Sequence, residues 1–144
     1  MPTNTKYIDA LTEIATTALS GYSVLFGSWD DVDRLLDRAE YPAVLNILSV
    51  SGGGTYRNGR VYDYQDMLIA FVDRVPRDAS GEDNFSATER MRSALKKFVK
   101  AFNKDGRFLP VDQYYYTTIY ESGANIHSGC LLEIRLTDAV GECV

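Results

Sequence analysis

Apolar residues recur at helical spacing in two long parts of the chain. The first stripe lies in residues 5–19 and predicts an amphipathic helix capped by Asn4 or Thr5. The second follows an expected loop over residues 76–85 and predicts a longer helix that begins at a capping box of Ser86 and Glu89 and stops at residues 103–106. Its buried stripe consists of Met91, Leu95, Phe98, Val99 and Phe102. A short helix is also expected over residues 28–39, because Ser28 can cap it and Pro42 follows it.

Between these helices the apolar pattern changes to that of strands. Five runs fit: residues 21–27, 43–50, 61–75, 113–121 and 126–138. The last run alternates apolar and polar positions, which is typical of a strand with one buried face. Strand pairs joined by hairpins, with helices packed on one face of a mainly antiparallel sheet, predict an α+β fold. No linker divides the chain, so residues 1–144 are expected to form one domain.

The segment SGGGTYRNGR, residues 51–60, resembles a phosphate-binding loop at first sight. A Walker loop, however, needs a lysine after its glycines and a helix opening behind it. Here Thr55, Tyr56 and Arg57 follow the glycines, and the next element is a strand. We therefore expect a long arm between two strands that is mobile in the isolated subunit and ordered by assembly. Its side chains Tyr56, Arg57 and Arg60 would then be available to a neighbouring molecule.

Charge is distributed unevenly along the chain. Twenty acidic against fifteen basic residues give a net charge of -5, which opposes non-specific binding to nucleic acid. Residues 90–107 depart from this balance, with seven basic residues against one acid, Asp105. The basic residues are Arg90, Arg92, Lys96, Lys97, Lys100, Lys104 and Arg107. This face is either a solvated outer surface or a surface that meets an acidic face of a neighbouring copy.

The sequence offers no clear catalytic or metal-binding motif. The one histidine, His127, is expected to be an exposed residue at a strand end, and no second histidine or nearby cysteine could join it as a metal ligand. Cys130 is expected to be a small buried hydrophobe and Cys143 a free thiol. We assign no catalytic residue, metal or cofactor, and an enzyme would require a pocket lined by at least two titratable residues.

The first residues lack an apolar run behind a basic flank, so a soluble, intracellular protein without membrane contact is expected.

Tyrosine is unusually frequent, with ten in the chain. Residues 114–116 are three consecutive tyrosines, so within a strand they must point to both faces of the sheet. Tyrosine combines a large contact area with a hydrogen-bonding tip, which suits protein interfaces. We expect one sheet face to be covered by helices and the other by a partner, with Tyr115 as a contact.

Several segments in this order resemble the tail terminator family of long-tailed phages, the minor tail protein U type. These are YPAVLNILSVSGG (41–53), YDYQDMLIAFVDRVP (62–76), ATERMRSALKKFVKAF (87–102) and the closing LLEIRLTD (131–138), before a terminus VGECV. The resemblance implies a structural protein without catalytic residues or cofactor. It implies a ring, a hexamer in that family, that caps the tail tube and then contacts the head.

The partners implied by the resemblance are other copies of the chain, the tail tube protein and head-tail connector proteins, with no specific nucleic acid and no membrane. The implied location is the bacterial host cytoplasm during assembly, and then the virion tail of a phage or prophage. A head-tail connector or tail-completion protein remains open, as does a protein-binding module unrelated to phages. An enzyme of unrecognised class is the remaining alternative. The predicted interface consists of Tyr56, Arg57, Arg60, Arg92, Lys96, Lys97, Lys100 and Tyr115.

Overall fold

The computed structural model describes residues 6–27, 34, 40–76, 78–122 and 127–143. The elements in chain order are α1 (Lys6–Ala18), β1 (Ser23–Gly27), β2 (Ala43–Arg57), β3 (Arg60–Arg74), α3 (Gly81–Asp105), β4 (Tyr115–Ser122) and β5 (His127–Thr137). The helix predicted over residues 28–39 lies outside the described residues except for Arg34, which is helical. Each of the five predicted strand segments contains a strand.

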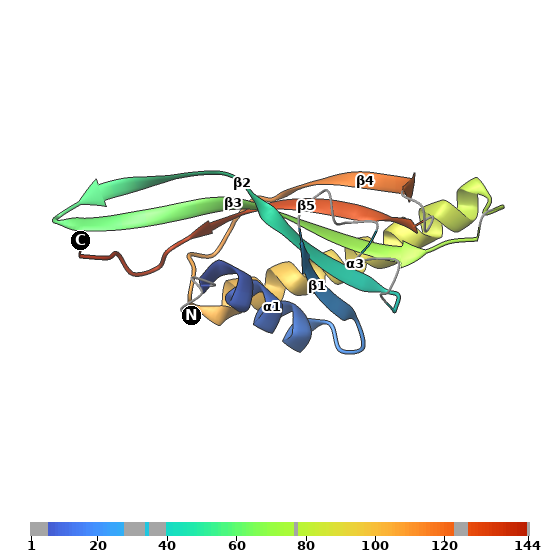
Figure 1. Cartoon of the computed structure of the whole chain (residues 1–144), viewed down its shortest axis with the longest axis horizontal. Helices are drawn as coiled ribbons and strands as arrows, with labels where there is room; N and C mark the ends of the chain where they lie inside the picture. Colours follow the sequence, from blue (N-terminus) through green and yellow to red (C-terminus); the bar gives the residue numbers. More distant parts are fainter. Residues whose placement is uncertain (1–5, 28–33, 35–39, 77, 123–126, 144) are drawn as a thin grey trace.

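The strands form one mixed sheet in the order β1-β2-β3-β5-β4. β1 runs parallel to β2, and the other neighbours are antiparallel. Both helices lie on one face of the sheet (Figure 1). The predicted α+β fold class is therefore confirmed, although the parallel pairing of β1 was not foreseen in a sheet expected to consist of hairpins.

The main core lies between the two helices and the sheet. Leu11 and Ile14 of α1 and Phe98 of α3 are buried against the sheet residues Ile69 and Phe71. The rings of Phe71 and Phe98 meet edge to face with centroids 5.7 Å apart. Aromatic pairs in this geometry contribute beyond the apolar area they bury.

The opposite face of the sheet, here called the outer face, carries a smaller apolar cluster. Its buried members alternate with the core residues along β2 and β3, as the pleat requires. They are Ala43, Leu45, Ile47, Ala70 and Val72. The central parts of β2 and β3 are thus buried on both faces.

Helix α3 begins six residues earlier than the sequence predicted. Its N-cap is Ser80, whose hydroxyl accepts from the amide of Asp83 at 3.1 Å, while the Asp83 carboxylate accepts from the amide of Ser80 at 3.1 Å. This is the capping box, and it replaces the one expected at Ser86 and Glu89. The predicted loop over residues 76–85 therefore contains the first turn of the helix.

Candidate interaction surfaces

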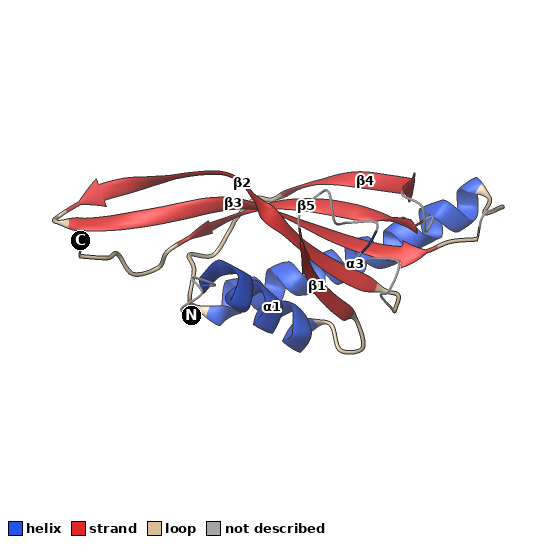
Figure 2. Ribbon diagram, in the orientation of Figure 1, coloured by secondary structure: helices blue, strands red, loops and turns tan. Residues whose placement is uncertain are grey.

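The segment from Ser51 to Asp66, here called the arm, is a two-stranded β ribbon. β2 and β3 stay paired from Ser51–Asp66 to Arg57–Arg60. The pairing register shifts between Ile47 and Ser51, and such irregularities bend and twist a ribbon. Beyond this shift the ribbon extends past the helical layer (Figure 2). The strands expected on either side of the arm therefore continue through it, because the glycines belong to β2. The mobility of the arm in the isolated subunit stays a prediction.

The glycines of the arm make room for an aromatic ring. Gly53 pairs with Tyr64, and a Cβ at Gly53 would lie 2.5 Å from the Tyr64 hydroxyl oxygen. The Tyr64 ring therefore lies against bare backbone. The arm ends in a two-residue turn in which Asn58 has φ 53° and Gly59 φ 76°. Two consecutive positive φ values identify a type I′ turn, for which Asn-Gly is the favoured sequence.

The two edges of the arm differ. The β3 edge is joined by the C-terminal segment, since Val61 and Glu142 exchange two backbone hydrogen bonds of 2.8 Å. Arg60 Nη1 donates to the carbonyl oxygen of Gly141 at 2.8 Å. In the described part of the chain, no strand pairs with the other edge, along β2 from Gly52 to Arg57. An unpaired strand edge can accept a strand from another chain.

The tip of the arm brings together three of the predicted interface residues. Arg57 and Arg60 are cross-strand partners, so their side chains leave the same face of the ribbon. Tyr56 projects from the other face and is 74% exposed. Arg57 lies over the Tyr62 ring at 4.7 Å. Within the described residues, neither arginine forms an ion pair with a carboxylate.

The basic face of α3 is only partly available for contacts. Arg90 pairs with Asp73 at 3.2 Å, and Arg92 pairs with Glu89 at 3.6 Å and lies over the Phe85 ring. The predicted interface residue Arg92 is thus occupied within its own chain. Four exposed lysines form no ion pair with any described residue: Lys96, Lys97, Lys100 and Lys104.

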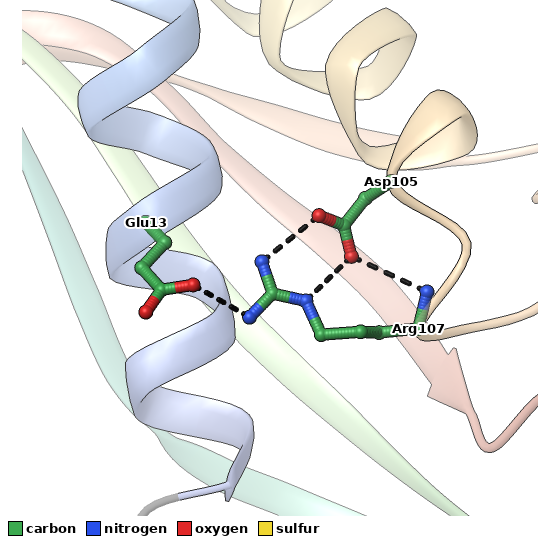
Figure 3. Close-up of polar contacts among 3 residues, drawn as sticks. All are labelled: Glu13, Asp105 and Arg107. Carbon is green, nitrogen blue, oxygen red and sulfur yellow. Dashed lines mark hydrogen bonds and ion pairs between the residues drawn. The ribbon is translucent and has the colours of Figure 1, made fainter.

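Arg107, counted with this basic face in the sequence, instead joins the two helices (Figure 3). Its Nε donates to Asp105 at 2.6 Å, and its Nη1 donates to Glu13 of α1 at 2.7 Å. The hydrogen bonds from Arg107 lower the pKa of Asp105. These bonds hold the C-terminal end of α3 against α1 and leave the Arg107 side chain little freedom to contact a partner.

A groove of about 600 Å³ lies beside the start of β4, and we call it the outer groove. Segment 109–115 forms one wall, and Asp66, Glu133 and Arg135 line it from β3 and β5. Apolar surface is exposed there, with Leu109 47% and the predicted interface residue Tyr115 69% exposed. The sequence predicted Tyr115 as an interface residue but did not predict the groove, because the lining of the groove comes from three separate parts of the chain.

The charge of the outer groove is negative. Arg135 bonds both oxygens of Asp66, at 2.8 and 3.2 Å, and this pairing lowers the pKa of the Asp66 carboxyl. Asp112 and Glu133 also line the groove, and neither forms a direct ion pair with a described residue. Two unpaired carboxylates therefore remain beside an exposed apolar wall.

A partly buried polar cluster that the sequence did not predict lies where α1 meets the arm. The Lys6 ammonium lies 2.7 Å from Asp138, which is only 2% exposed. The Tyr7 hydroxyl donates to Asp63 at 3.0 Å, and burial together with this carboxylate raises the Tyr7 pKa. Because these residues come from α1, the arm and the C-terminal segment, the cluster fixes the arm to the body.

His127 is buried, not exposed as predicted. Its ring lies 6.5 Å from that of Tyr41, which supplies part of its cover. The predictions for the two thiols agree with the structure: Cys130 is buried and Cys143 exposed, and both are free. Burial raises the pKa of the Cys130 thiol to about 11, so it carries no nucleophilic thiolate near neutral pH.

Within the described residues, no cluster of three or more His, Cys, Asp or Glu side chains is arranged to hold a metal ion. In the same part of the chain, no helix combines the length and apolar character needed to cross a bilayer. Neither a known protein-family model nor a curated protein matches the sequence.

Proposed function

We propose that this protein is a structural assembly protein of a phage or prophage tail. It acts as a ring-forming tail terminator or as a neck component that caps the tail tube. Its mechanism is steric: a ring of copies docks on the last ring of the tube and buries the surface that would recruit another. The proposal rests on the resemblance of the sequence segments together with one structural observation.

That observation is the arm. A β ribbon with one unpaired edge, an exposed tyrosine and two arginines at its tip extends past the body of the molecule. Such a ribbon buries little of its own surface: none of its residues between Ser51 and Asp66 is fully buried. A projecting element of this kind is suited to reach an adjacent subunit, and repeated head-to-tail contacts close into a ring when the rotation per copy allows.

An enzyme is the second candidate, because the outer groove meets the requirement for several titratable residues in one pocket. Its chemistry is weak, however. Asp66 is already paired with Arg135, which lowers its pKa, so it is no proton donor near neutral pH. Asp112 and Glu133 are exposed to solvent. The groove is better suited to contact a charged surface than to perform general acid-base catalysis.

The experiment that tests the proposal is a mass measurement in solution, by light scattering or native mass spectrometry. The expected result is a closed assembly of several copies, formed by the chain alone or upon addition of tail tubes. A monomer at every protein concentration and salt concentration, with or without tail tube protein, would contradict it. A dimer of fixed mass would favour the protein-binding module.

A further inference from the structure

We propose that the tip of the arm of one copy binds in the outer groove of a neighbouring copy. This inference rests on the proposed function and names the contact on which the ring depends. The arm supplies two arginines and an exposed tyrosine, and the groove supplies two unpaired carboxylates and an exposed apolar wall. The partner is thus a second copy of this chain.

The positive charge at the tip favours an acidic partner surface. Like charges directly opposite on paired strands destabilise a hairpin, and Arg57 and Arg60 are such a pair. Their own chain compensates them with the Tyr62 ring and the Gly141 carbonyl oxygen rather than with a carboxylate. The tip therefore suits an acidic surface that the described part of its own chain does not provide.

The outer groove offers side chains complementary to those of the tip. Asp112 and Glu133 offer the acceptors for arginine, and planar guanidinium groups match carboxylates in a bidentate manner. Leu109 and Tyr115 offer the apolar wall against which Tyr56 can pack. The volume of about 600 Å³ falls within the range of sites that enclose whole small ligands, so it accommodates more than one side chain.

The length of the paired ribbon excludes binding of the tip to the groove of the same molecule. Asp66 lines the groove and pairs with Ser51 at the root of the same arm. The paired ribbon from Ser51 to Arg57 spans about 20 Å, at about 3.3 Å per residue. A paired ribbon cannot fold back over that length, so the tip reaches only the groove of another copy. Each copy presents one tip and one groove at different places, as a closed ring requires.

A charge-swap experiment tests this contact. Arg57→Glu replaces one of the two tip guanidinium groups by a carboxylate, and Asp112→Lys with Glu133→Lys reverses the charge of the groove. Each variant alone is expected to weaken self-association by about tenfold or more, because like charges then face each other. An equimolar mixture of the two variants is expected to recover assembly. In the mixture the carboxylate introduced at the tip of the first variant meets the basic groove of the second, and the basic tip of the second meets the acidic groove of the first.

Two matched controls carry the same changes in charge elsewhere. Lys104→Glu changes the α3 face by the same amount as Arg57→Glu changes the tip. Glu40→Lys with Asp78→Lys matches the groove reversal at two exposed positions that do not line the groove. Both controls should assemble like the parent chain, and circular dichroism should show that all variants are folded. The docking alone would be overturned if the parent assembled and neither Arg57→Glu nor Asp112→Lys with Glu133→Lys weakened that assembly. Absence of any assembly by the parent would overturn the docking and the proposed ring together.

Discussion

The same two strands, β2 and β3, pass through two different environments. Between Ala43 and Ile47, and between Met67 and Val72, they are almost fully buried, with α1 and α3 on one face and the outer apolar cluster on the other. In the arm no residue is fully buried. Strand pairing is present in both regions, so hydrogen bonding does not distinguish them. What differs is side-chain burial, which is why we expect the body to provide stability and propose that the arm serves association.

The largest expected effect comes from removing a buried aromatic ring of the body, and an exposed ring of the arm serves as the comparison. Phe98→Ala removes a fully buried ring that contacts Phe71, and should lower the free energy of unfolding by about 3–5 kcal/mol. Tyr56→Ala removes an exposed ring and should change it by less than about 0.5 kcal/mol. Urea denaturation measures both. Similar losses for the two variants would show that the arm belongs to the folding core.

One glycine in the body and one in the arm differ in the reason why a side chain is not tolerated. A Cβ at Gly129 of β5 would lie 1.8 Å from the carbonyl oxygen of Phe71, so Gly129→Ala should cost about 1–3 kcal/mol or prevent folding. Gly59 in the arm turn has φ 76° and open space around its Cβ position. Gly59→Ala should therefore cost about 1 kcal/mol through backbone strain alone.

The arm amides should lose hydrogen-exchange protection in Gly59→Ala, while the amides of β3 between Met67 and Val72 keep theirs. Equal loss of protection in both segments would contradict the separation of arm and body.

A smaller effect is expected from pH at the junction of the helices. Hydrogen bonds from Arg107 lower the pKa of Asp105 from its usual 3.8. A depressed folded-state pKa stabilises the fold above the unfolded value, and this contribution is lost as pH falls through the folded value. The pair is partly exposed, so the loss should be at most about 1 kcal/mol below pH 3.8. Arg107→Gln should flatten this part of the stability profile, and an unchanged profile would contradict the assignment.

The body of the fold could be predicted from the sequence because its signals are local and strong. The apolar stripe of residues 5–19 placed α1 to within a residue, and Met91 to Phe102 identified the buried face of α3. The start of α3 was missed because Ser80 with Asp83 and Ser86 with Glu89 both match a capping box. The earlier start is accompanied by the burial of Asn84, which lies before Ser86.

The continuation of the two strands through the arm was missed for a different reason. Three consecutive glycines have low intrinsic strand preference, and the contact that holds them, the Tyr64 ring against Gly53, comes from the partner strand. The Asn-Gly pair at residues 58–59 was a usable hairpin signal, and it would have placed the turn correctly. The burial of His127 was not predicted because the Tyr41 ring that lies against it is distant in the sequence. The outer groove was not predicted because three distant segments form it.

Mass in solution, compared between the parent chain and a Tyr56→Ser, Arg57→Ser variant, tests directly whether the tip of the arm drives association. Both side chains are exposed, so thermal unfolding should be nearly the same for the two proteins. The parent should form a closed multimer under conditions in which the variant remains a monomer. A variant that assembles as readily as the parent, or a parent that remains a monomer under all conditions, would contradict a role of the tip in association.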